Sequence, residues 1–568
     1  MAPSRALKKN DSHASEAEAV VDLELVKQAS SRVANSEAFI SGDALYDMAQ
    51  ENLRGFQTMF QQELEEQAAL ASQVSLTWAS ACSGSEGAFY VMEALSRAYS
   101  FYPDWQEMSL THAFSCEIQK DKQKWIRAVL ECGPLKQDGT PSPARSPDSD
   151  ADSGRSGCLF TDIQKLADGH AECVIHNKKC PVPGCDIFVI GSSCKDFSKA
   201  NPKKESQKLV FQQPSSLGGS AQTYHGFTGY VAAHSPGIVI YENVDGLEEQ
   251  IGMSAQSNLD ILLTTMTNLG YKAQPLRTDA AAFGLPARRR RLYILFVRKV
   301  TAKLQTQARS LTKSFEMFNS MVASCLRSPP CAKELLLNCS SNEVREFLEE
   351  RKRHRSANKS QKSSSSWTEQ HMKFAEAQDL RWGQPYPEEL KLNEWFETLT
   401  AREQDVLVLS RAQAPDAGFR NVSQSLGREH SMSFCTETKQ HVAPPMLPRQ
   451  LLFVELLKPT RLMLGQEALL FQGFPVCSFL ALVEEFGIDL HEQPINLGKR
   501  KRHSEPKKWL TEALMTDLAG NAMALPVLLA IAQSAVASLL FRPVTSAATA
   551  KETADALSAL DALSALGS

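Results

Sequence analysis

Short apolar runs alternate with amphipathic stretches from residue 74 onward. The runs at 74–82 and 110–118 are each followed by a stretch with helical spacing, at 89–100 and at 120–130. Strand-like and helix-like segments that alternate in this way are typical of a parallel sheet flanked by helices. The pattern predicts an α/β protein with a Rossmann-like, doubly wound, mostly parallel sheet.

Further apolar runs continue this pattern to residue 297. They occupy residues 158–163, 185–192, 237–244 and 291–297, and the segment 260–270 between the last two has helical spacing. We expect the four runs to be strands of the same sheet.

Composition divides the chain into a main α/β region and several flanking segments. Residues 1–73 predict a helical, partly disordered extension, and residues 74–298 carry the strand and helix alternation. Within that region, residues 135–157 are rich in Pro, Ser, Asp and Gly, which cannot bury a core, so we expect a disordered insertion.

The alternation stops after residue 298. Residues 299–460 are irregular and predict a smaller separate domain with a basic, Ser-rich linker at 351–366. Residues 461–541 are apolar and helical again, and residues 542–568 form a low-complexity tail.

Composition restricts the class of protein. Of the 568 residues, 43% are hydrophobic and 22% charged, as in an ordinary soluble globular protein. No run approaches the roughly 18 uninterrupted apolar residues of a membrane span, and the first residues lack a hydrophobic signal core. The odd number of cysteines, 13, suits reduced thiols better than a disulfide scaffold. These features predict an intracellular protein without a membrane segment.

The charge balance argues against a general binder of polyanions. The formal net charge is −4, so contact with nucleic acid would depend on local basic patches. Two such tracts lie at residues 351–355 and 499–508. Each is either a solvated charged loop or a segment for phosphate contact or nuclear import.

Polar side chains follow the first three strands of the main region. The first strand ends in a loop of small residues with Cys82, Gly84 and Gly87, which leads directly into a helix. Such a loop brings backbone amides close to a ligand at a helix N-terminus. Glu117 after the second strand could hold ribose hydroxyls, and Asp162 after the third, with the amide of Ile163, could read an adenine edge. Acidic residues that only cap the following helices would stand at the same positions. The prediction of a nucleoside-cofactor site therefore depends on the three strand ends taken together.

Cys194 follows the apolar strand at 185–192. The thiol is therefore expected at the ligand edge of the sheet, and neighbouring Lys195 would favour the thiolate that nucleophilic attack needs. The next loop contributes four further lysines, which would suit phosphates: Lys199, Lys203, Lys204 and Lys208. A cysteine buried as an ordinary hydrophobe is the alternative for Cys194.

A carboxyl group and two guanidinium groups are predicted at the same edge. Glu242 ends the strand at 237–244, where burial could raise its pKa and allow it to donate a proton. Arg289 and Arg291 stand two residues apart at the start of the next strand, so both point the same way. They would suit a base carbonyl and a phosphate, and an exposed basic turn is the alternative.

The ordered set of motifs resembles the cytosine-5 DNA methyltransferase family, as a divergent member. The blocks are CSGSEG, CEIQKD, FTDI, GSSCKDFS, ENV, ARRRRLYI, FQGFP and DLAGNAM, with a variable segment before the last two. The resemblance spans residue 74 to about residue 537, apart from the insertions. It implies an S-adenosylmethionine-dependent catalytic domain formed by 74–298 and 461–541, with 299–460 as target-recognition domain.

The resemblance also implies roles for individual residues. Cys194 would attack carbon 6 of a flipped cytosine and Glu242 would act at N3. Arg291 would hold O2, and Arg289 would support the active-site loop or a phosphate. The residues implied to cradle S-adenosyl-L-methionine are Cys82, Gly84, Gly87, Glu117, Asp162, Ile163 and Asn521. A DNA substrate and a nuclear location follow, with transfer RNA and the cytoplasm as the alternatives.

Four positions depart from the family pattern. Ser193 and Lys195 replace the usual Pro and Gln beside the nucleophile, and Ala287 replaces a Gln before the arginine cluster. Glu86 replaces a Gly, which predicts an added negative charge near the methionine moiety of the cofactor. A catalytically inactive homologue that still binds nucleic acid is therefore a third alternative.

One further pattern precedes the nucleophile strand. Cys173, His176, Cys180 and Cys185 have intervals compatible with tetrahedral zinc. Buried thiols would look the same, so the sequence gives only a weak prediction of zinc.

Overall fold

The structure is a computed structural model of the chain. It describes residues 20–22, 32–68, 73–100, 107–132, 157–198, 209–217, 219–250, 256–299, 311–357, 366–383, 385–426, 434–435, 440–485 and 509–539. The insertion predicted at 135–157 lies almost wholly outside the described residues. The basic tract 499–508, the tail 542–568 and the four loop lysines after Cys194 lie outside them as well.

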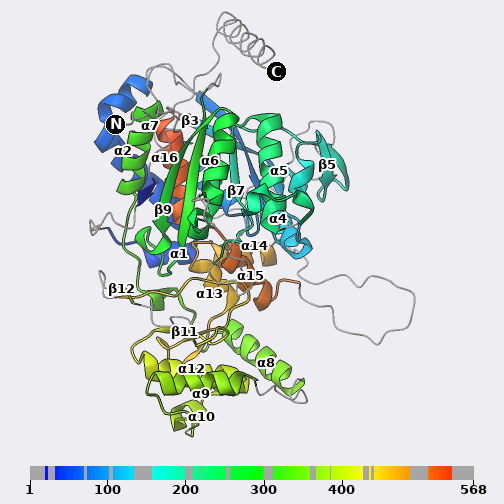
Figure 1. The fold of residues 1–568 in the computed structure, drawn as a ribbon. Coiled ribbons are helices and arrows are strands. Elements are labelled where there is room, and N and C mark those ends of the chain that lie inside the picture. The colour runs from blue at the N-terminus through cyan, green and yellow to red at the C-terminus, as the bar shows by residue number, and fades with distance from the viewer. Residues whose placement is uncertain are drawn as a thin grey trace, which may run out of the picture.

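A ten-stranded sheet forms the centre of the larger lobe (Figure 1). Its spatial order is β1-β9-β10-β8-β7-β2-β3-β4-β5-β6. The strands are β1 (Val21–Asp22), β2 (Gln73–Ala81), β3 (Glu107–Cys116), β4 (Cys158–Phe160), β5 (His170–Cys173), β6 (Lys178–Pro181), β7 (Ile187–Gly191), β8 (Ile238–Asn243), β9 (Tyr271–Asp279) and β10 (Arg290–Arg298). Within the run from β9 to β4 the strands are parallel apart from β10, which pairs antiparallel with both β8 and β9. The doubly wound, mostly parallel α/β fold is confirmed.

Helices cover both faces of this sheet. One apolar core packs α2 (Ala44–Ala68), α3 (Gly87–Ser100), α4 (Lys120–Cys132), α7 (Leu311–Ser324) and α16 (Leu525–Ser538) on one face. A second core packs α5 (Gly219–His234) and α6 (Asn258–Asn268) on the other. Alternate residues of β7 enter the two cores, since Ile187 and Val189 face one and Phe188 and Ile190 the other. Burial on both faces explains why the central strands are apolar along their whole length.

The segments before residue 74 and after residue 299 extend this larger lobe. β1 pairs in parallel with β9, and α2 packs against α3 and α16. α7 packs mainly on α16, so this helix belongs to the larger lobe although it lies within 299–460. Strand β9, with Pro275 at its centre, was not predicted because its polar and apolar residues do not form a continuous apolar run.

The smaller lobe lies below the carboxyl edge of the sheet in Figure 1 and has its own apolar cores. Its helices are α8 (Asn342–Ala357), α9 (Ser366–Ala377), α10 (Glu388–Lys391), α11 (Glu394–Glu397) and α12 (Ala401–Gln413). Its strands are β11 (Phe419–Asn421), β14 (Leu452–Val454) and β15 (Arg461–Leu462), with the pair β12 (Phe434–Cys435) and β13 (Gln440–His441) nearby. The remaining α-helices are α1 (Ser36–Ser41), α13 (Gly465–Leu470), α14 (Val476–Glu485) and α15 (Glu512–Asn521).

A buried ion pair joins the two lobes. The Arg461 guanidinium lies 2.6 Å from Oε1 and 2.9 Å from Oε2 of Glu467, and neither residue is more than 1% exposed. Arg461 also donates to the carbonyl of Leu337 at 2.7 Å. Because a buried charge is costly without a partner of opposite sign, this pair fixes the start of α13 against the smaller lobe.

Among the described residues, the stretch Glu512–Ser538 has the length and apolar composition of a membrane-spanning helix. Of its most apolar part, 72% is buried inside the protein, and the chain leaves helical geometry between α15 and α16. We therefore assign it to the core, where α16 packs between α3 and α7.

Candidate active site

The nucleophile candidate Cys194 lies on a short turn after β7. Its carbonyl accepts hydrogen bonds from the amides of Phe197 at 3.1 Å and Ser198 at 2.9 Å. The Asp196 carboxylate accepts from the amide of Ser220 at 2.9 Å, at the start of α5. These contacts hold the turn at both ends and leave Cys194 half-buried at the carboxyl edge of the sheet.

The same turn packs tightly against the segment that follows β8. Phe197 is buried, and a Cβ atom added to Gly246 would lie 2.2 Å from its carbonyl oxygen. Only glycine permits this approach of two backbones. Gly246 therefore fixes the distance between the Cys194 turn and the end of β8.

A buried hydrogen-bond network joins the ends of β7 and β8. Ser192 donates to the Tyr241 hydroxyl at 2.5 Å and accepts from the amide nitrogen of Asn243 at 2.7 Å. Because Gly191 is paired with Glu242 in the sheet, the network places the Cys194 turn beside the Glu242 carboxyl group.

Glu242 and Arg291 form an ion pair at this edge. The Nε atom of Arg291 lies 2.9 Å from Oε1 of Glu242, although the angle does not make a hydrogen bond and Oε1 has none among the described residues. Tyr293 pairs with Glu242, and Arg291 lies two residues before Tyr293 on β10, so both side chains are on the same side of the strand. The structure therefore brings the predicted carboxyl and guanidinium groups together.

Arg289 lies beneath this pair and is 3% exposed. Its backbone amide donates to Asp279 at 2.8 Å, and its side chain donates to the carbonyl of Gly520 at 3.2 Å. Burial, followed by repulsion from Arg291, lowers the pKa of Arg289 to about 10, while the charges of Glu242 and Cys194 act to raise it. Arg289 thus lies within electrostatic range of the other three residues predicted for catalysis.

The loop after β2 has an unusual backbone. Cys82, Gly84 and Glu86 all have positive φ angles, of 51°, 52° and 57°. The Gly84 amide donates to the Glu117 carboxylate at 2.9 Å, and Trp125 donates to the carbonyl of Ser85 at 2.9 Å. Strained backbone conformations of this kind cluster at active sites and ligand-binding loops. The structure therefore joins the predicted loop directly to Glu117.

Gly87 begins α3 and has a packing role. A Cβ atom added there would lie 2.6 Å from Cδ2 of Leu525 on α16. A larger residue at position 87 would therefore push α3 away from α16.

The expected charge of Glu86 beside the cofactor is not what the structure shows. The Glu86 side chain is 0% exposed and accepts a hydrogen bond from Ser80 at 2.8 Å, beneath the loop. Burial raises the pKa of Glu86 to about 7, against the opposing effect of the serine hydroxyls. The left-handed backbone at this position turns the carboxyl group into the core, which its replacement of a Gly could not indicate.

Asp162 and Ile163 follow β4, next to the end of β3. The Asp162 side chain caps the short 3₁₀ helix Ile163–Lys165 by accepting from the amide of Gln164 at 3.0 Å. Ile163 is buried against Gly226 of α5. The amide of Glu117 donates to the carbonyl of Phe160 at 3.0 Å, so the two acidic residues stand at adjacent strand ends.

Asn521 is exposed at the end of α15, and its amide donates to Asp517 of the same helix at 2.7 Å. Asp517 lies 3.4 Å from Lys122 of α4, which brings α15 near the end of β3. No contact recorded between described residues joins the Asn521 side chain to Gly84 or Glu117.

The predicted metal set needs one correction. The sulfur of Cys185 is buried and accepts a hydrogen bond from Tyr230 at 3.4 Å, and burial raises the pKa of this thiol to about 12. Cys158, at the start of β4, takes its place beside Cys173, His176 and Cys180. Cys158 could not be recognised from the spacing because it lies 15 positions before Cys173, a longer interval than those within the other three.

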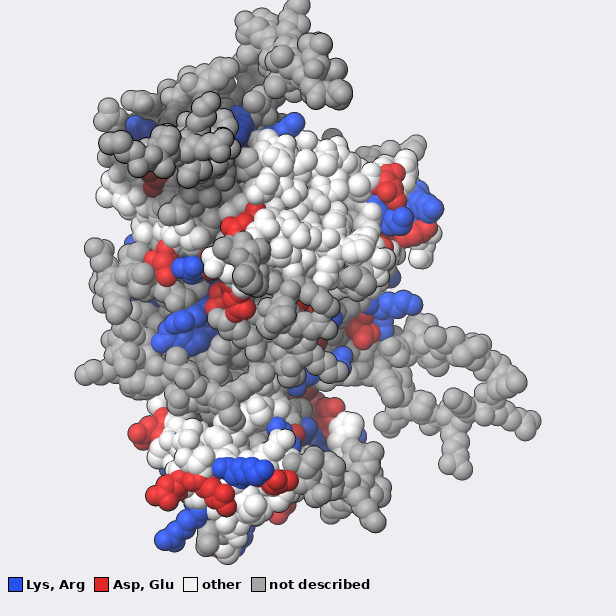
Figure 2. All heavy atoms as spheres, in the orientation of Figure 1, with Lys and Arg blue, Asp and Glu red and all other residues white. Residues whose placement is uncertain are grey.

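Residues of the basic tract 351–355 form hydrogen bonds and ion pairs within the smaller lobe. Arg351 donates to the carbonyl of Thr398, and Lys352 pairs with Glu349 and Glu394 at 2.9 and 2.8 Å. On the face shown in Figure 2, described basic and acidic side chains are interspersed. This tract therefore forms ion pairs along a helix, as a solvated charged face does.

Comparison with known proteins identifies relatives of one kind. The family model described as C-5 cytosine-specific DNA methylase matches residues 161–484. A DNA (cytosine-5-)-methyltransferase of Cryptococcus neoformans, DMT5, is 24% identical over 470 residues, which cover 78% of this chain and 16% of that protein. The type II methyltransferase M.NgoFVII of Neisseria gonorrhoeae is 31% identical over 117 residues, 21% of this chain and 28% of that enzyme. The chain thus spans less than a third of the length of either relative.

A similar solved structure is that of a putative DNA modification methyltransferase encoded within a prophage of E. coli. It has a TM-score of 0.39 and 13% identity, with 81% of this chain and 98% of that chain covered.

Proposed function

We propose, because the chain belongs to the C-5 cytosine-specific DNA methylase family, that it transfers a methyl group to carbon 5 of cytosine in DNA. The observation that carries the proposal is the joint placement of the Cys194 turn, the Glu242–Arg291 ion pair and buried Arg289 at the carboxyl edge of the sheet. A nucleophile, a proton donor and cationic groups around one base are the groups that this reaction requires.

The first chemical step is addition to the base. The Glu242 carboxylate takes the proton of the Cys194 thiol, and the sulfur forms a bond to carbon 6 of cytosine. Glu242 passes this proton to N3, so the electron pair of the C5–C6 double bond becomes available at carbon 5. Arg291, now paired with Glu242, would turn to the O2 atom of the base when the base enters, and Arg289 would keep the site positively charged.

The second step restores the aromatic ring. Carbon 5 takes the methyl group, a base removes the proton from carbon 5, and the sulfur of Cys194 leaves carbon 6 as the double bond re-forms. The proton on N3 returns through Glu242 to the sulfur, which restores the thiol. The net change is replacement of one hydrogen of cytosine by a methyl group, with release of a proton. Since carbon 6 is stacked inside a duplex, the nucleotide has to leave the helix, at a cost of a few kcal/mol.

The family uses S-adenosyl-L-methionine, which supplies an electrophilic methyl group on a sulfonium sulfur. The residues present fit this cofactor. The strained loop Cys82–Glu86 leads into the N-terminus of α3, which suits a carboxylate, and Glu117 at the end of β3 suits ribose hydroxyls. Asp162 and the amide of Ile163 would contact the adenine. Asn521 would join them only after its side chain leaves Asp517.

The smaller lobe is proposed to hold the nucleic acid. A β-bridge joins Ala287 to Ala443, and the amide of Arg288 donates to the carbonyl of Ala443 at 2.8 Å. The lobe is therefore attached directly to the strand that carries Arg289 and Arg291. A DNA substrate would place the protein in the nucleus.

DNA is preferred over transfer RNA because the relative that covers 78% of this chain is named a DNA methyltransferase. Members of the family that methylate transfer RNA carry a Cys-Phe-Thr signature. This chain has the first two residues in the opposite order, in Phe434-Cys435-Thr436, which gives no support to RNA; Thr436 lies outside the described residues. Ser193, Lys195 and Ala287 replace residues that are usual in the family. If the protein binds nucleic acid but transfers no methyl group, these three replacements support a non-catalytic homologue.

The test is transfer of label from S-adenosylmethionine to duplex DNA or to transfer RNA. We expect label in cytosine of DNA with the wild-type protein and with Cys331→Ala, which removes an exposed thiol, and none with Cys194→Ala. Label in transfer RNA alone would refute the DNA substrate. Binding of duplex DNA without label in either nucleic acid would refute the enzymatic function.

A second measurement tests the covalent step itself. DNA with 5-fluorocytosine cannot lose a proton from carbon 5, so the wild-type protein should remain bound to it through denaturing electrophoresis. Cys194→Ala should form no such adduct. An adduct that survives in Cys194→Ala would contradict the assignment of the nucleophile.

A further inference from the structure

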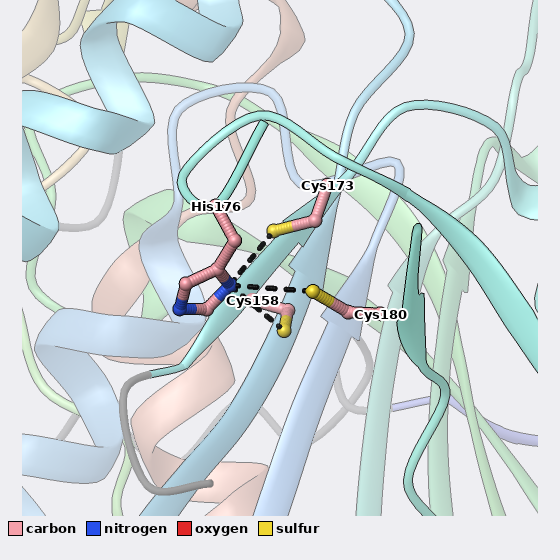
Figure 3. Close-up of side chains that lie close together, drawn as sticks. All are labelled: Cys158, Cys173, His176 and Cys180. Atoms are coloured by element: carbon pink, nitrogen blue, oxygen red, sulfur yellow. Dashed lines mark hydrogen bonds between the residues drawn. The ribbon is translucent and has the colours of Figure 1, made fainter. Parts of the chain in front are cut away.

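Three thiols and one imidazole converge at the outer edge of the sheet (Figure 3). The Nδ1 atom of His176 lies 3.6 Å from the sulfur of Cys158, 3.3 Å from that of Cys173 and 3.4 Å from that of Cys180. All four donor atoms lie within 4.8 Å of one another. They come from β4, from β5, from β6 and from the turn between the last two strands.

Hydrogen bonds alone do not explain this arrangement. A neutral imidazole nitrogen has one lone pair, so Nδ1 of His176 can accept one good hydrogen bond, yet three sulfurs point at it. The three thiols also place their sulfurs beside one another, where they offer only weak donors and weak acceptors. A cation between the four atoms would satisfy all of them at once.

The distances agree with a tetrahedral ion. Zinc bonds of about 2.3 Å to sulfur and about 2.0–2.1 Å to nitrogen, at tetrahedral angles, separate nitrogen from sulfur by about 3.6 Å. The three observed separations are 3.6, 3.3 and 3.4 Å. Small outward movements of Cys173 and Cys180 would complete the geometry.

We propose that Cys158, Cys173, His176 and Cys180 bind a zinc ion in a closed, structural site. Three soft sulfur ligands and one imidazole select zinc over magnesium or calcium, which prefer oxygen. Four protein ligands leave no position for water, so the ion takes no part in methyl transfer.

The place of the site in the fold indicates what the ion does. Strand β4 pairs with β5 through only Phe160 and Cys173, and β6 is the outermost strand of the sheet. An ion held by residues of β4, β5 and β6 would fix the small hairpin to the sheet. Because β4 leads directly to Asp162, the ion would also hold that strand end in place.

The direct test is the metal content of the purified full-length protein. After dialysis against metal-free buffer, elemental analysis should find about one zinc per chain, held by four ligands. Zinc should be lost from Cys173→Ser and Cys180→Ser and kept by Cys185→Ser, which removes the buried thiol that lies outside the cluster. Wild-type protein with no zinc and oxidised or free thiols would overturn the proposal, as would zinc that survives both cluster substitutions.

Cobalt gives a measurement that does not depend on folding of the variants. Wild-type protein refilled with cobalt should show the intense visible bands of a tetrahedral ion and thiolate charge-transfer absorption for three sulfurs. Weak octahedral bands or no thiolate absorption would contradict the site. Neither measurement requires methyl transfer, so its result is separate from that of the proposed function.

Discussion

Replacement of Glu86 by Gln tests whether the protein carries a buried acid under its cofactor loop. The Glu86 carboxyl group is 0% exposed, and burial raises its pKa from the ordinary 4.5 to about 7. In the unfolded chain the group loses its proton near the ordinary value. Between these two pKa values the folded protein therefore holds more protons than the unfolded chain, and stability falls as the pH rises.

The magnitude follows from the difference between the two pKa values. A difference of roughly 2.5 pKa units corresponds to about 3 kcal/mol, which the wild-type protein loses between about pH 4.5 and pH 7. Gln keeps an oxygen that can accept from Ser80 at 2.8 Å, and it has no charge. We expect Glu86→Gln to match the wild type at pH 5 and to be more stable at pH 8, by up to about 3 kcal/mol.

Thermal unfolding of both proteins across this pH range is the assay. The difference between their midpoints should grow from pH 5 to about pH 7 and then stay constant. Glu131→Gln, which removes a surface carboxylate of α4, is the control and should give a small difference that hardly changes with pH. A Glu86→Gln protein that is less stable than the wild type at pH 8, or a difference independent of pH, would refute the reasoning.

Three further predictions concern the nucleophile turn, the joint between the lobes and the proton donor. Gly246→Ala would push the added Cβ against the Phe197 carbonyl, 2.2 Å away, and displace the Cys194 turn, so kcat/KM for methyl transfer should fall about 100-fold. Gly55→Ala, where no atom lies within 4 Å of the new Cβ, should keep wild-type activity, and equal rates for both variants would count against the packing argument. Glu467→Gln leaves the Arg461 charge buried without compensation, and denaturant unfolding should show a loss of about 3–5 kcal/mol. Glu388→Gln breaks only an exposed pair with Lys391 and should cost less than about 1 kcal/mol, so similar losses in the two variants would disprove the role of burial. Glu242→Gln should lower the methyl-transfer rate by about 100-fold or more while equilibrium dialysis shows unchanged binding of S-adenosylmethionine, and wild-type turnover in this variant would exclude Glu242 as proton donor.

The central strands could be predicted from the sequence because they are buried on both sides. Strands β7, β8 and β10 appear as continuous apolar runs, and their observed bounds lie close to those expected. β9 was missed because Pro275 and several polar residues interrupt its apolar residues. The hydrophobic pattern therefore identifies central strands well and strands near an edge poorly.

The site residues could be placed at strand ends, but their orientations could not. Cys194, Glu242 and Arg291 lie at the same edge because the carboxyl ends of parallel strands meet there and β10 runs the opposite way. The inward turn of Glu86 depends on a single positive φ angle. The position of Cys158 depends on pairing between β4 and β5. Local sequence patterns contain neither kind of information.

The reversed direction of β10 limits how this part of the chain can change its length. Alternate residues of a strand face opposite sides, so one residue inserted or deleted between the Ala287–Ala443 bridge and Leu292 would turn Arg291 away from Glu242. The segment that joins α4 to β4 has no such restriction, since β7, β2 and β3 separate β4 from the strand that carries Glu242. Homologues should therefore vary freely in length between α4 and β4 while keeping a fixed number of residues between β9 and the middle of β10.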